Sequence, residues 1–441
     1  MKYAIMNEKK VNKGRRNFVK TSASVIAGGA FLSGFPMKAF GTEEKNEIRI
    51  GLVGCGSRGT GAANEALKTS ARVKLVAIGD VFEDRINKSF QYLKNTYGDQ
   101  VEVPDSNKFI GFDAYQKVIE NCDVVLLATP PPFRPLHLET AVKASKHVFI
   151  EKPLFVDIPG YHKIMDANEL ANRKNLSLVV GLQWRYETGY QLMKEKIDNG
   201  IIGDITSLDV YYNVAAPIIH LRQPGQTEMN YQVRNWRYFT WLWGGQLAGQ
   251  TIHPIDVMNW FMNDYPVTAK GLGGRQVFKG PDQGNTYDHH YAEFEYSNKI
   301  KLHVQSTNTN NTWGRVGFHV QGTKGYADEK FRIYTSKGEL LWEHRDKDEM
   351  VGPSQKCQSD FINSIINRKP LNQLEYGAKS TLTTIIGRMA IHSGQIITIE
   401  EALKSKKSIL PKDFNWDVEM PSKPGPDGNY SIPMPGSTNV I

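Results

Sequence analysis

The chain has 441 residues, of which 40% are hydrophobic and 23% are charged, with 39 glycines and 21 prolines. This composition fits a globular protein of two ordinary domains and excludes a disordered chain, a collagen-like chain and a coiled coil. The formal net charge of +8 comes almost entirely from residues 1–41, which hold eight basic side chains and one acidic side chain. The remainder holds 46 basic and 45 acidic residues, so its charge does not indicate a nucleic-acid partner.

Residues 1–41 have the pattern of an export signal. The pair Arg15-Arg16 precedes a mildly apolar stretch over 21–35 and a small-x-small sequence at 39–41. The stretch is too short and too rich in small residues to cross a hydrocarbon core of ~30 Å, and no other run approaches that length, so we predict no membrane anchor. We expect a twin-arginine signal peptide, recognised by the twin-arginine export machinery, and a periplasmic or otherwise exported protein. The alternative is a basic tail on a cytoplasmic enzyme.

The segment that follows has the pattern of a dinucleotide-binding βαβ unit. An apolar strand over 48–53 runs into Gly54-Cys55-Gly56-Ser57-Arg58-Gly59, a helix-like stretch follows over 60–68, and a second strand over 73–80 ends in Asp80. In this pattern the first glycine permits the tight turn, the second lets backbone N–H groups approach the pyrophosphate, and the third lets the helix pack close to the strand. Asp80 is placed to bind the ribose hydroxyls, which favours NAD over NADP. The alternative is a glycine turn without a ligand.

Two further strands are expected to end at the same crevice. The apolar run over 122–128 ends at Thr129-Pro130, and the run over 147–150 delivers Glu151-Lys152-Pro153. Because ligands of open parallel sheets bind beyond the carboxyl ends of the strands, these residues should face the dinucleotide. We therefore assign cofactor binding to Gly54, Gly56, Ser57, Arg58, Gly59, Asp80, Thr129, Pro130, His137, Glu151 and Lys152.

After residue 200 the pattern changes to alternating apolar and polar residues, over 207–212, 292–296 and 300–305. Alternation of this kind is typical of half-buried antiparallel strands. The fold class predicted is α/β: an N-terminal Rossmann dinucleotide-binding domain plus a C-terminal α+β domain with an open, predominantly antiparallel sheet. The domain limits predicted are 1–41 (signal peptide), 42–165 (Rossmann domain), 166–420 (substrate-binding domain) and 421–441, a Pro- and Gly-rich tail without a core of its own.

With these motifs in place, the chain resembles the glucose-fructose oxidoreductase / inositol dehydrogenase / MocA (Gfo/Idh/MocA) family over residues 46 to 410. The resemblance rests on the Gly-rich turn, Asp80, the Glu-Lys-Pro motif, the stretch 244–253 and the sequence over 320–325. It implies a nicotinamide-dependent oxidoreductase acting on a sugar, polyol or sugar derivative. On this analogy Lys152 polarises or orients the reacting oxygen and His253 exchanges the proton that accompanies hydride transfer. Both side chains suit those tasks, since each can be tuned to titrate near neutrality.

One position departs from the family pattern. Members commonly carry Asp or Glu four residues before the histidine, where this chain has Gly249. A glycine transfers no protons, so the usual relay is incomplete, and Gln250 offers hydrogen bonds but no titration. Asp256, three residues after His253, is either a partner that orients the imidazole or an acid that interacts with the helix dipole.

An aromatic and basic cluster suits a carbohydrate substrate, because aromatic faces pack on sugar C–H surfaces while Arg and Asn bind hydroxyls. We expect about half of these side chains to touch substrate, since many aromatic residues belong to cores. The candidates are Trp184, Arg185, Tyr186, Asn235, Trp236, Arg237, Asp256 and Tyr287, with Trp241 and Trp243 nearby in the sequence. The three cysteines lack metal-ligand spacing, and we predict no metal site.

Export adds a constraint on the cofactor. Free nicotinamide cofactor is scarce outside the cytoplasm, so we expect it to be held tightly and regenerated within the cycle. A carbohydrate oxidoreductase re-oxidised by a second sugar satisfies this expectation. So does an NAD-dependent glycosidase or lyase that oxidises transiently without net redox change, and a non-catalytic sugar-binding protein is a third possibility. We also expect a homo-oligomer, because exposed sheet faces of such proteins often pair.

Overall fold

The structure is a computed structural model that describes residues 47–345 and 351–441. The predicted export signal therefore lies outside the described residues. The first of two sheets has six parallel strands in the order β3-β2-β1-β4-β5-β6. The strands are β1 (Ile48–Val53), β2 (Val73–Asp80), β3 (Lys108–Ile110), β4 (Val124–Leu127), β5 (His147–Ile150) and β6 (Leu178–Val180).

Helices cover both faces of this sheet, and its central strands are accordingly apolar throughout. All four residues of β4 are buried, as are five of the six in β1. Continuous apolar runs of this kind are what a parallel sheet buried on both faces requires. The surrounding helices are α1 (Ser57–Thr69), α2 (Glu83–Tyr97), α3 (Ala114–Glu120), α4 (Arg134–Lys143), α5 (Ile158–Arg173) and α10 (Pro353–Ile366).

The second sheet has nine strands in the order β14-β13-β12-β11-β7-β10-β9-β8-β15. Every neighbouring pair is antiparallel except β7 and β10, which run parallel. The predicted fold class, a Rossmann domain followed by an open and mostly antiparallel sheet, is thus confirmed. The strands are β7 (Ile205–Val214), β8 (Thr268–Gly274), β9 (His289–Glu295), β10 (Lys301–Asn308), β11 (Arg315–Gly322), β12 (Gly325–Asp328), β13 (Arg332–Thr335), β14 (Leu340–Glu343) and β15 (Ile397–Thr398).

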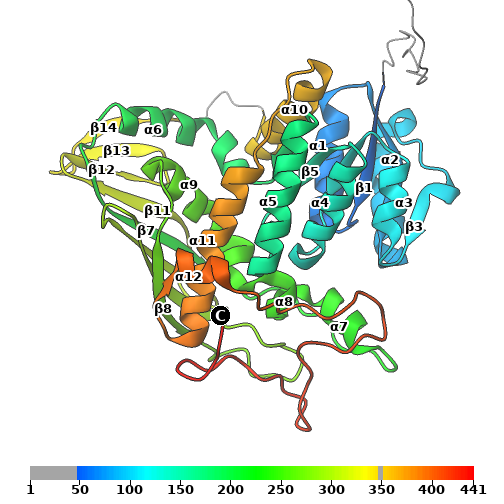
Figure 1. The fold of residues 1–441 in the computed structure, drawn as a ribbon. Coiled ribbons are helices and arrows are strands. Elements are labelled where there is room, and N and C mark those ends of the chain that lie inside the picture. Colours follow the sequence, from blue (N-terminus) through cyan, green and yellow to red (C-terminus); the bar gives the residue numbers. More distant parts are fainter. Residues whose placement is uncertain (1–46, 346–350) are drawn as a thin grey trace, which may run out of the picture. The chain divides into compact units, whose positions relative to one another are not determined.

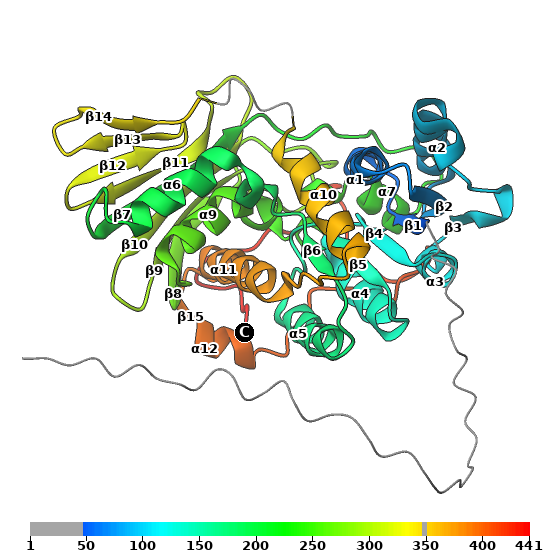
Figure 2. The ribbon, with the colours of Figure 1, turned by 90° about the horizontal axis from the view of Figure 1, so that it is seen from above.

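Three helices pack on the inner face of the second sheet, where alternate strand residues such as Leu302 and Val304 are fully buried. They are α6 (Thr188–Asp198), α9 (Ile252–Met262) and α11 (Leu374–Ser393). Helix α11 also packs on α5, and Figures 1 and 2 show α5 and α11 between the two sheets. The remaining helices are α7 (Glu228–Arg234), α8 (Thr240–Trp243) and α12 (Ile399–Lys404). In the described part of the chain, no helix is long and apolar enough to cross a membrane.

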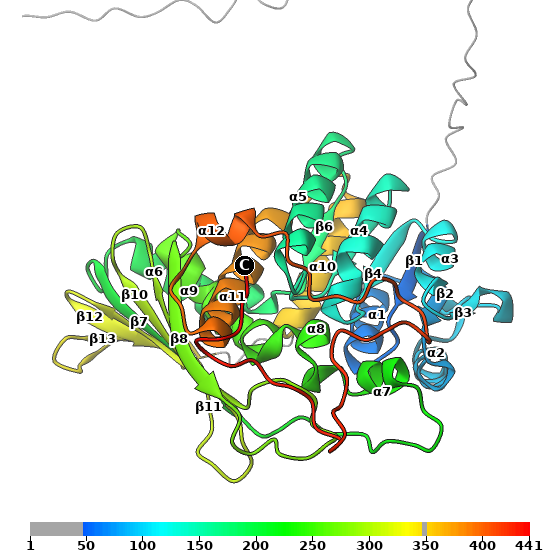
Figure 3. The same cartoon turned by 60° about the horizontal axis from the view of Figure 1, so that its bottom comes forward.

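One boundary differs from the expected domain limits. The first sheet continues to β6, beyond residue 165, because α5 crosses that point and returns the chain to the sheet. The C-terminal segment follows the surface as expected and is held there by Tyr430, which is 4% exposed. Tyr430 packs edge-on against Phe239 and its hydroxyl bonds the Glu228 carboxylate of α7. Figure 3 shows this segment, drawn in red, running past α8 and α7.

Candidate active site

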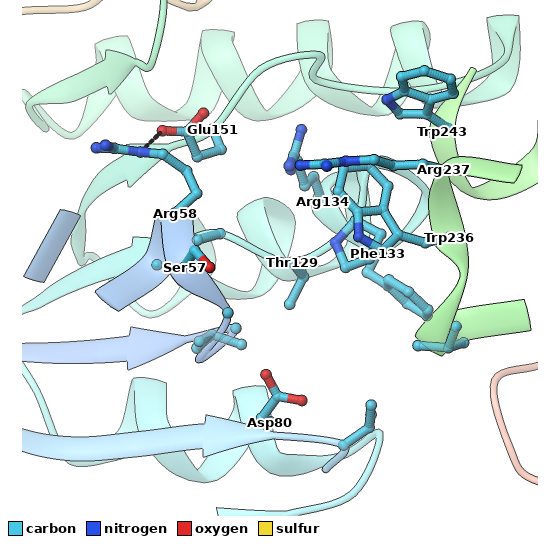
Figure 4. Close-up of a pocket in the computed structure, with 18 of the residues that line it drawn as sticks. Ser57, Arg58, Asp80, Thr129, Phe133, Arg134, Glu151, Trp236, Arg237 and Trp243 are labelled. Atoms are coloured by element: carbon cyan, nitrogen blue, oxygen red, sulfur yellow. Dashed lines mark hydrogen bonds and ion pairs between the residues drawn. The ribbon is translucent and has the colours of Figure 1, made fainter. Parts of the chain in front are cut away.

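A pocket of about 580 Å³ opens at the carboxyl ends of the central strands of the first sheet. Residues at or just beyond the ends of β1, β2, β4 and β5 form one wall, and the opposite wall comes from β7 and from the stretch 218–253. Figure 4 shows the two walls, with Ser57 and Asp80 on one side and Trp236, Arg237 and Trp243 on the other. The pocket lies where open parallel sheets bind their ligands.

The Gly-rich turn has the geometry of a phosphate cradle. Gly54 has φ of +94°, and a Cβ atom at Gly59 would lie 1.8 Å from the Gly54 carbonyl oxygen, so only glycine fits there. Gly56 caps α1 without any side-chain hydrogen bond, and the first turn of α1 has no acidic residue. The N–H groups of this helix end are therefore free for an anion, which they attract together with the helix dipole.

Asp80 lies at the end of β2 beside that turn. Its Oδ2 accepts from the Cys55 N–H at 2.6 Å and its Oδ1 from the Phe82 N–H at 3.0 Å, which fixes the carboxylate at the pocket wall. Burial raises the pKa of Asp80, an effect that these two hydrogen bonds oppose. Arg85 lines the same wall. The cradle and the carboxylate together fit a dinucleotide with its pyrophosphate at α1 and a ribose at Asp80.

His137 and Thr129 occupy the middle of this wall. Their side chains lie 3.3 Å apart between Oγ1 and Nδ1, and the imidazole stacks on Tyr115 with ring centroids 4.1 Å apart. Burial, together with the charge of Arg134, lowers the pKa of His137 to about 3. His137 is therefore a neutral, packed part of the wall rather than a proton carrier.

Glu151, at the end of β5, is 4% exposed and is held by Arg58, whose Nε lies 2.7 Å from its Oε1. Figure 4 marks this bond. A Cβ atom at Gly181 would lie 2.7 Å from the same Oε1, so the glycine makes room for the carboxylate. Glu151 thereby fixes the position of the backbone that carries Lys152.

Lys152 projects from the end of β5 toward the stretch 247–251. Its Nζ donates a hydrogen bond to the Gly249 carbonyl at 2.8 Å. Burial lowers the pKa of Lys152 to about 8; Glu151 opposes the shift, and the positive charges of Arg134 and Arg237 add to it. The amine can therefore exchange a proton near neutral pH.

His253 stands in the first turn of α9 and lines the same pocket as Lys152. The side chain is 6% exposed and its ring stacks on Trp184, with centroids 5.8 Å apart. Burial, with the charges of Lys152 and Arg58, lowers its pKa well below 6.5, so the imidazole is neutral. The pocket thus brings a neutral imidazole and a titratable amine to one place, as proton exchange at a substrate hydroxyl requires.

The stretch before α9 is a π-helical turn, Leu247–Thr251, and Gly249 lies within it. A Cβ atom at Gly249 would lie 1.7 Å from Nε1 of Trp243, so the indole already fills the space that a side chain there would need. A carboxylate at this position is excluded while Trp243 keeps its place. The packing of Trp243 against Gly249 therefore explains why this position differs from the family pattern.

Three predicted substrate residues, Asn235, Trp236 and Arg237, do line the pocket. Asn235 holds the local chain, because its amide bonds both the N–H and the C=O of His220. Arg237 lies over the Trp236 ring at 5.1 Å and makes no hydrogen bond or ion pair with any described residue, which leaves its N–H groups free for a ligand.

The other predicted substrate residues lie outside the pocket wall. The guanidinium of Arg185 binds both oxygens of Asp256 at 2.8 Å, and Ser380 donates to the same carboxylate at 2.6 Å. Asp256 therefore joins α9 to Arg185 and Ser380, and it makes no hydrogen bond with the imidazole of His253. Tyr287 donates to the Pro433 carbonyl at 2.7 Å. The last two are Trp184, which packs behind His253, and Tyr186, which accepts from Gln373.

Sequence reasoning missed several wall residues. Arg134 is 4% exposed, its Nη1 bonds the Pro153 carbonyl, and its Nε is buried without a partner. Arg134 follows the prolines after β4. This position beyond the end of a strand is the one sequence feature that could have identified it as a pocket residue. Tyr212 and Gln250 line the substrate side, and nothing in their sequence context marked Tyr212.

Two family models match the chain. Residues 48–182 match "Oxidoreductase family, NAD-binding Rossmann fold" and residues 190–328 match "GFO/IDH/MocA C-terminal domain". Together these ranges cover more than half of the 441 residues. The boundary between them falls just after β6, where the first sheet ends.

Individual proteins agree with this assignment. The chain is 30% identical to an inositol 2-dehydrogenase of Agrobacterium fabrum over 52% of this chain and 59% of that protein, which is less than two thirds of its length. It is 26% identical to an oxidoreductase of Streptococcus pneumoniae over 60% of this chain and 67% of that protein. The fold is similar to that of scyllo-inositol dehydrogenase from Lactobacillus casei with bound NAD(H) and scyllo-inositol, with a TM-score of 0.61, 22% identity, and coverage of 80% and 99%. The chain therefore belongs to the GFO/IDH/MocA family of NAD-binding oxidoreductases.

Proposed function

We propose that the protein transfers hydride between a carbinol carbon of a sugar, polyol or sugar derivative and a tightly held NAD. One observation carries this proposal: the amine of Lys152 and the neutral imidazole of His253 face the same pocket into which the phosphate cradle opens. A hydride acceptor and two proton-handling groups are the components that carbinol oxidation needs.

Bound NAD supplies the hydride acceptor, and the side chains of the protein bind the substrate and exchange the proton. The Lys152 ammonium group donates a hydrogen bond to the reacting oxygen and stabilises the negative charge that develops there. The imidazole of His253 accepts the hydroxyl proton and returns it in the reverse reaction. Arg237 binds neighbouring hydroxyl groups through its free N–H groups, while the Trp236 ring beneath it packs on the carbon skeleton.

Tight retention of the cofactor is supported by a clasp between Arg234 and Asp84. Arg234, at the end of α7, binds both carboxylate oxygens of Asp84 on α2, at 2.7 and 3.1 Å, and lies 3.9 Å over the Phe82 ring. The clasp joins the stretch 218–237 to the Rossmann domain across the pocket edge next to Asp80. We expect the clasp to slow the release of a dinucleotide bound in the pocket.

For the location of the enzyme, we propose export by the twin-arginine route to the periplasm. The Arg15-Arg16 pair and the apolar stretch after it support this proposal. Replacing both arginines by lysine should leave the protein in the cytoplasm after cell fractionation. Equal export of the doubly substituted chain would contradict the route.

For assembly, we propose self-association through the outer face of the second sheet. The strand register places Leu272, Tyr291, Gln305 and Tyr211 in one row across the strands, and Leu272 is 71% exposed. Exposed leucine and tyrosine side chains on one face of a sheet mark an association surface. Light scattering should give a mass above 49.7 kDa for the full chain, and Leu272→Lys should reduce it.

The deciding experiment is anaerobic incubation with a panel of sugars, cyclitols and aryl glycosides, following nicotinamide absorbance and product together. Lasting reduction that a second carbonyl compound reverses would establish the oxidoreductase. Lys152→Ala and His253→Ala should abolish it, whereas Lys143→Ala and His162→Ala, matched changes at exposed positions, should not.

Redox-neutral glycoside cleavage is the second candidate, which the missing carboxylate suggested. The dehydrogenases among the relatives favour net oxidation instead. Cleavage of an aryl glycoside without net reduction, lost in Lys152→Ala, would overturn the oxidoreductase proposal.

A further inference from the structure

A second cavity, of about 360 Å³, lies between α11, α8 and the C-terminal segment, and the proposed reaction makes no use of it. This volume is within the range of small-molecule sites. The wall combines hydroxyl, amide and basic side chains with apolar ones, and the apolar side chains contribute the larger part of its surface. Among the polar ones are Thr240, Asn285, Arg388, Ser405, Ser408 and Thr438.

Arg388 of α11 is an uncompensated cation in this wall. The side chain is 6% exposed, it makes no hydrogen bond or ion pair with any described residue, and its Nη1 is fully buried. Burial lowers its pKa to about 10, and Asp157 only partly opposes this. A buried guanidinium without partners is costly, so its surroundings must supply an anion or water.

Asp157, the acid in the same wall, is already committed to other donors. Its Oδ1 accepts from the Gly160 N–H at 3.0 Å, and its Oδ2 accepts from Ser408 Oγ at 2.8 Å and from the Ile409 N–H at 3.2 Å. The carboxylate caps α5 and fixes the chain after α12. It therefore leaves the charge of Arg388 unpaired.

Thr240, at the start of α8, offers a second group without a partner. Its Oγ1 is buried and makes no hydrogen bond with any described residue. Thr240 and Arg388 come from different elements and line the same cavity. Two residues with unpartnered polar atoms in one wall indicate a ligand that both accepts from a guanidinium and bonds a hydroxyl.

The C-terminal segment closes the cavity and is itself anchored. Lys407 Nζ donates to the Asn439 carbonyl, and the Gly436 N–H donates to Ser393 at 2.7 Å. Lys407 lies at an exposed position, where water solvates its charge, so Arg388 is the buried cation of this wall. His392 adds no charge, because burial lowers its pKa well below 6.5.

We propose that this cavity is a second ligand site, which takes a small hydroxylated carboxylate of the sugar-acid class. The carboxylate lies against the guanidinium of Arg388, which matches its planar shape, and hydroxyl groups bond Thr240 and the neighbouring amide and hydroxyl side chains. A carboxylate fits better than a phosphate, because one free cation balances a single negative charge. The site is independent of the proposed reaction.

The test titrates the full chain with D-gluconate by calorimetry and thermal unfolding, with D-sorbitol as the neutral analogue of the same carbon skeleton. Gluconate should bind and raise Tm, whereas sorbitol should do neither. Arg388→Met should weaken gluconate binding at least ten-fold. Lys379→Met removes a charge at the exposed side of the same helix and should leave the binding unchanged.

Gluconate can also enter the active-site pocket, so one further variant separates the two sites. Arg237→Ala should retain the binding that Arg388→Met loses. The reverse pattern would place the ligand in the active site and overturn the proposal.

Should Arg388→Met fail to fold, Thr240→Val tests the same site with almost no change in shape. It should weaken gluconate binding several-fold while the Tm without ligand stays the same. Three further results overturn the proposal: gluconate does not bind, which means that the cavity holds only water; sorbitol stabilises equally; or Thr240→Val and a folded Arg388→Met bind as the natural chain does.

Discussion

The indole of Trp243 occupies the space into which a side chain at Gly249 would project, with Nε1 only 1.7 Å from the position of its Cβ. The two residues are therefore a matched pair. Gly249 contributes its carbonyl, which accepts from Lys152 at 2.8 Å, at the position where the resemblance to the family predicts a carboxylate. A backbone carbonyl orients the amine without titrating, so in the proposed reaction Lys152 and His253 exchange the proton without a third acid.

Gly249→Ala should lower the free energy of unfolding by about 1–3 kcal/mol, because the added methyl group overpacks against the indole. In a Trp243→Ala background the same change should cost almost nothing, since the space is then open. A double-mutant cycle from urea unfolding measures this coupling. Equal costs in the two backgrounds would contradict the pairing.

Lys152→Met should abolish hydride transfer and yet stabilise the protein without cofactor at pH 7. The pKa of Lys152 is about 8 in the folded protein and near the ordinary lysine value of 10.5 when unfolded, so folding disfavours the charged amine. Between these values the unfolded chain binds more protons, and the stability of the natural protein rises with pH by up to about 1.4 kcal/mol per unit.

The advantage of Lys152→Met should therefore be largest below pH 8 and shrink as the pH rises toward 10.5. Urea unfolding of both proteins across this range provides the measurement. Lys143→Met, at an exposed position of α4, should show no such trend. A constant difference across the range would mean that the amine is not destabilised by burial.

Asp80→Ser should shift cofactor preference toward NADP. Removing the carboxylate removes the repulsion of a 2′-phosphate, and Arg85 on the same wall is placed to bind that group. The ratio of kcat/KM for NADP over NAD should rise at least about ten-fold, equal to about 1.4 kcal/mol. Adding Arg85→Ala should reverse the gain, whereas Lys88→Ala, exposed on the same helix, should not.

Asp256→Asn should cost stability far more than catalysis. It breaks a buried ion pair whose partner Arg185 remains, a change that costs about 3–5 kcal/mol. The control Asp166→Asn, at an exposed site, should cost almost nothing. A hundred-fold loss of kcat/KM at unchanged stability would instead return Asp256 to the role of orienting the imidazole.

Arg234→Ala should speed release of the bound nicotinamide at least about ten-fold, because it opens the clasp with Asp84. The rate is followed by exchange of bound cofactor against an excess of labelled NAD. Asp84→Asn should have a similar effect, and the two changes together should add little to either alone. Strict additivity would show that the residues act separately.

The sequence sufficed for features that depend on local spacing. The glycines, Asp80, Glu151 and Lys152 could be placed because strands in a βαβ unit end at a common edge. The same logic failed for Arg185 and Asp256, since neighbours along the chain do not tell which side of a helix faces the pocket. Their pairing joins residues 71 positions apart.

Other wall residues could not be found from the sequence for a related reason. Tyr212 reaches the pocket because β7 lies in the middle of the second sheet, and a strand order of this kind depends on long-range pairing. The position of the indole at Gly249 depends on a π-helical turn, which has no strong sequence signature.

The parallel pairing of β7 with β10 has a consequence for how the enzyme acquires its activity. Parallel neighbours need a long connection, and here that connection, residues 215–300, carries Arg234, Arg237, Trp243 and His253. Strands β7 and β10 cannot pair until the chain over 215–300 has brought them together. We therefore expect the centre of the sheet to form slowly and cooperatively. The two ends of the connection that carries these pocket residues are therefore brought together only when the centre of the sheet forms, and we expect partly folded chains to lack a complete pocket.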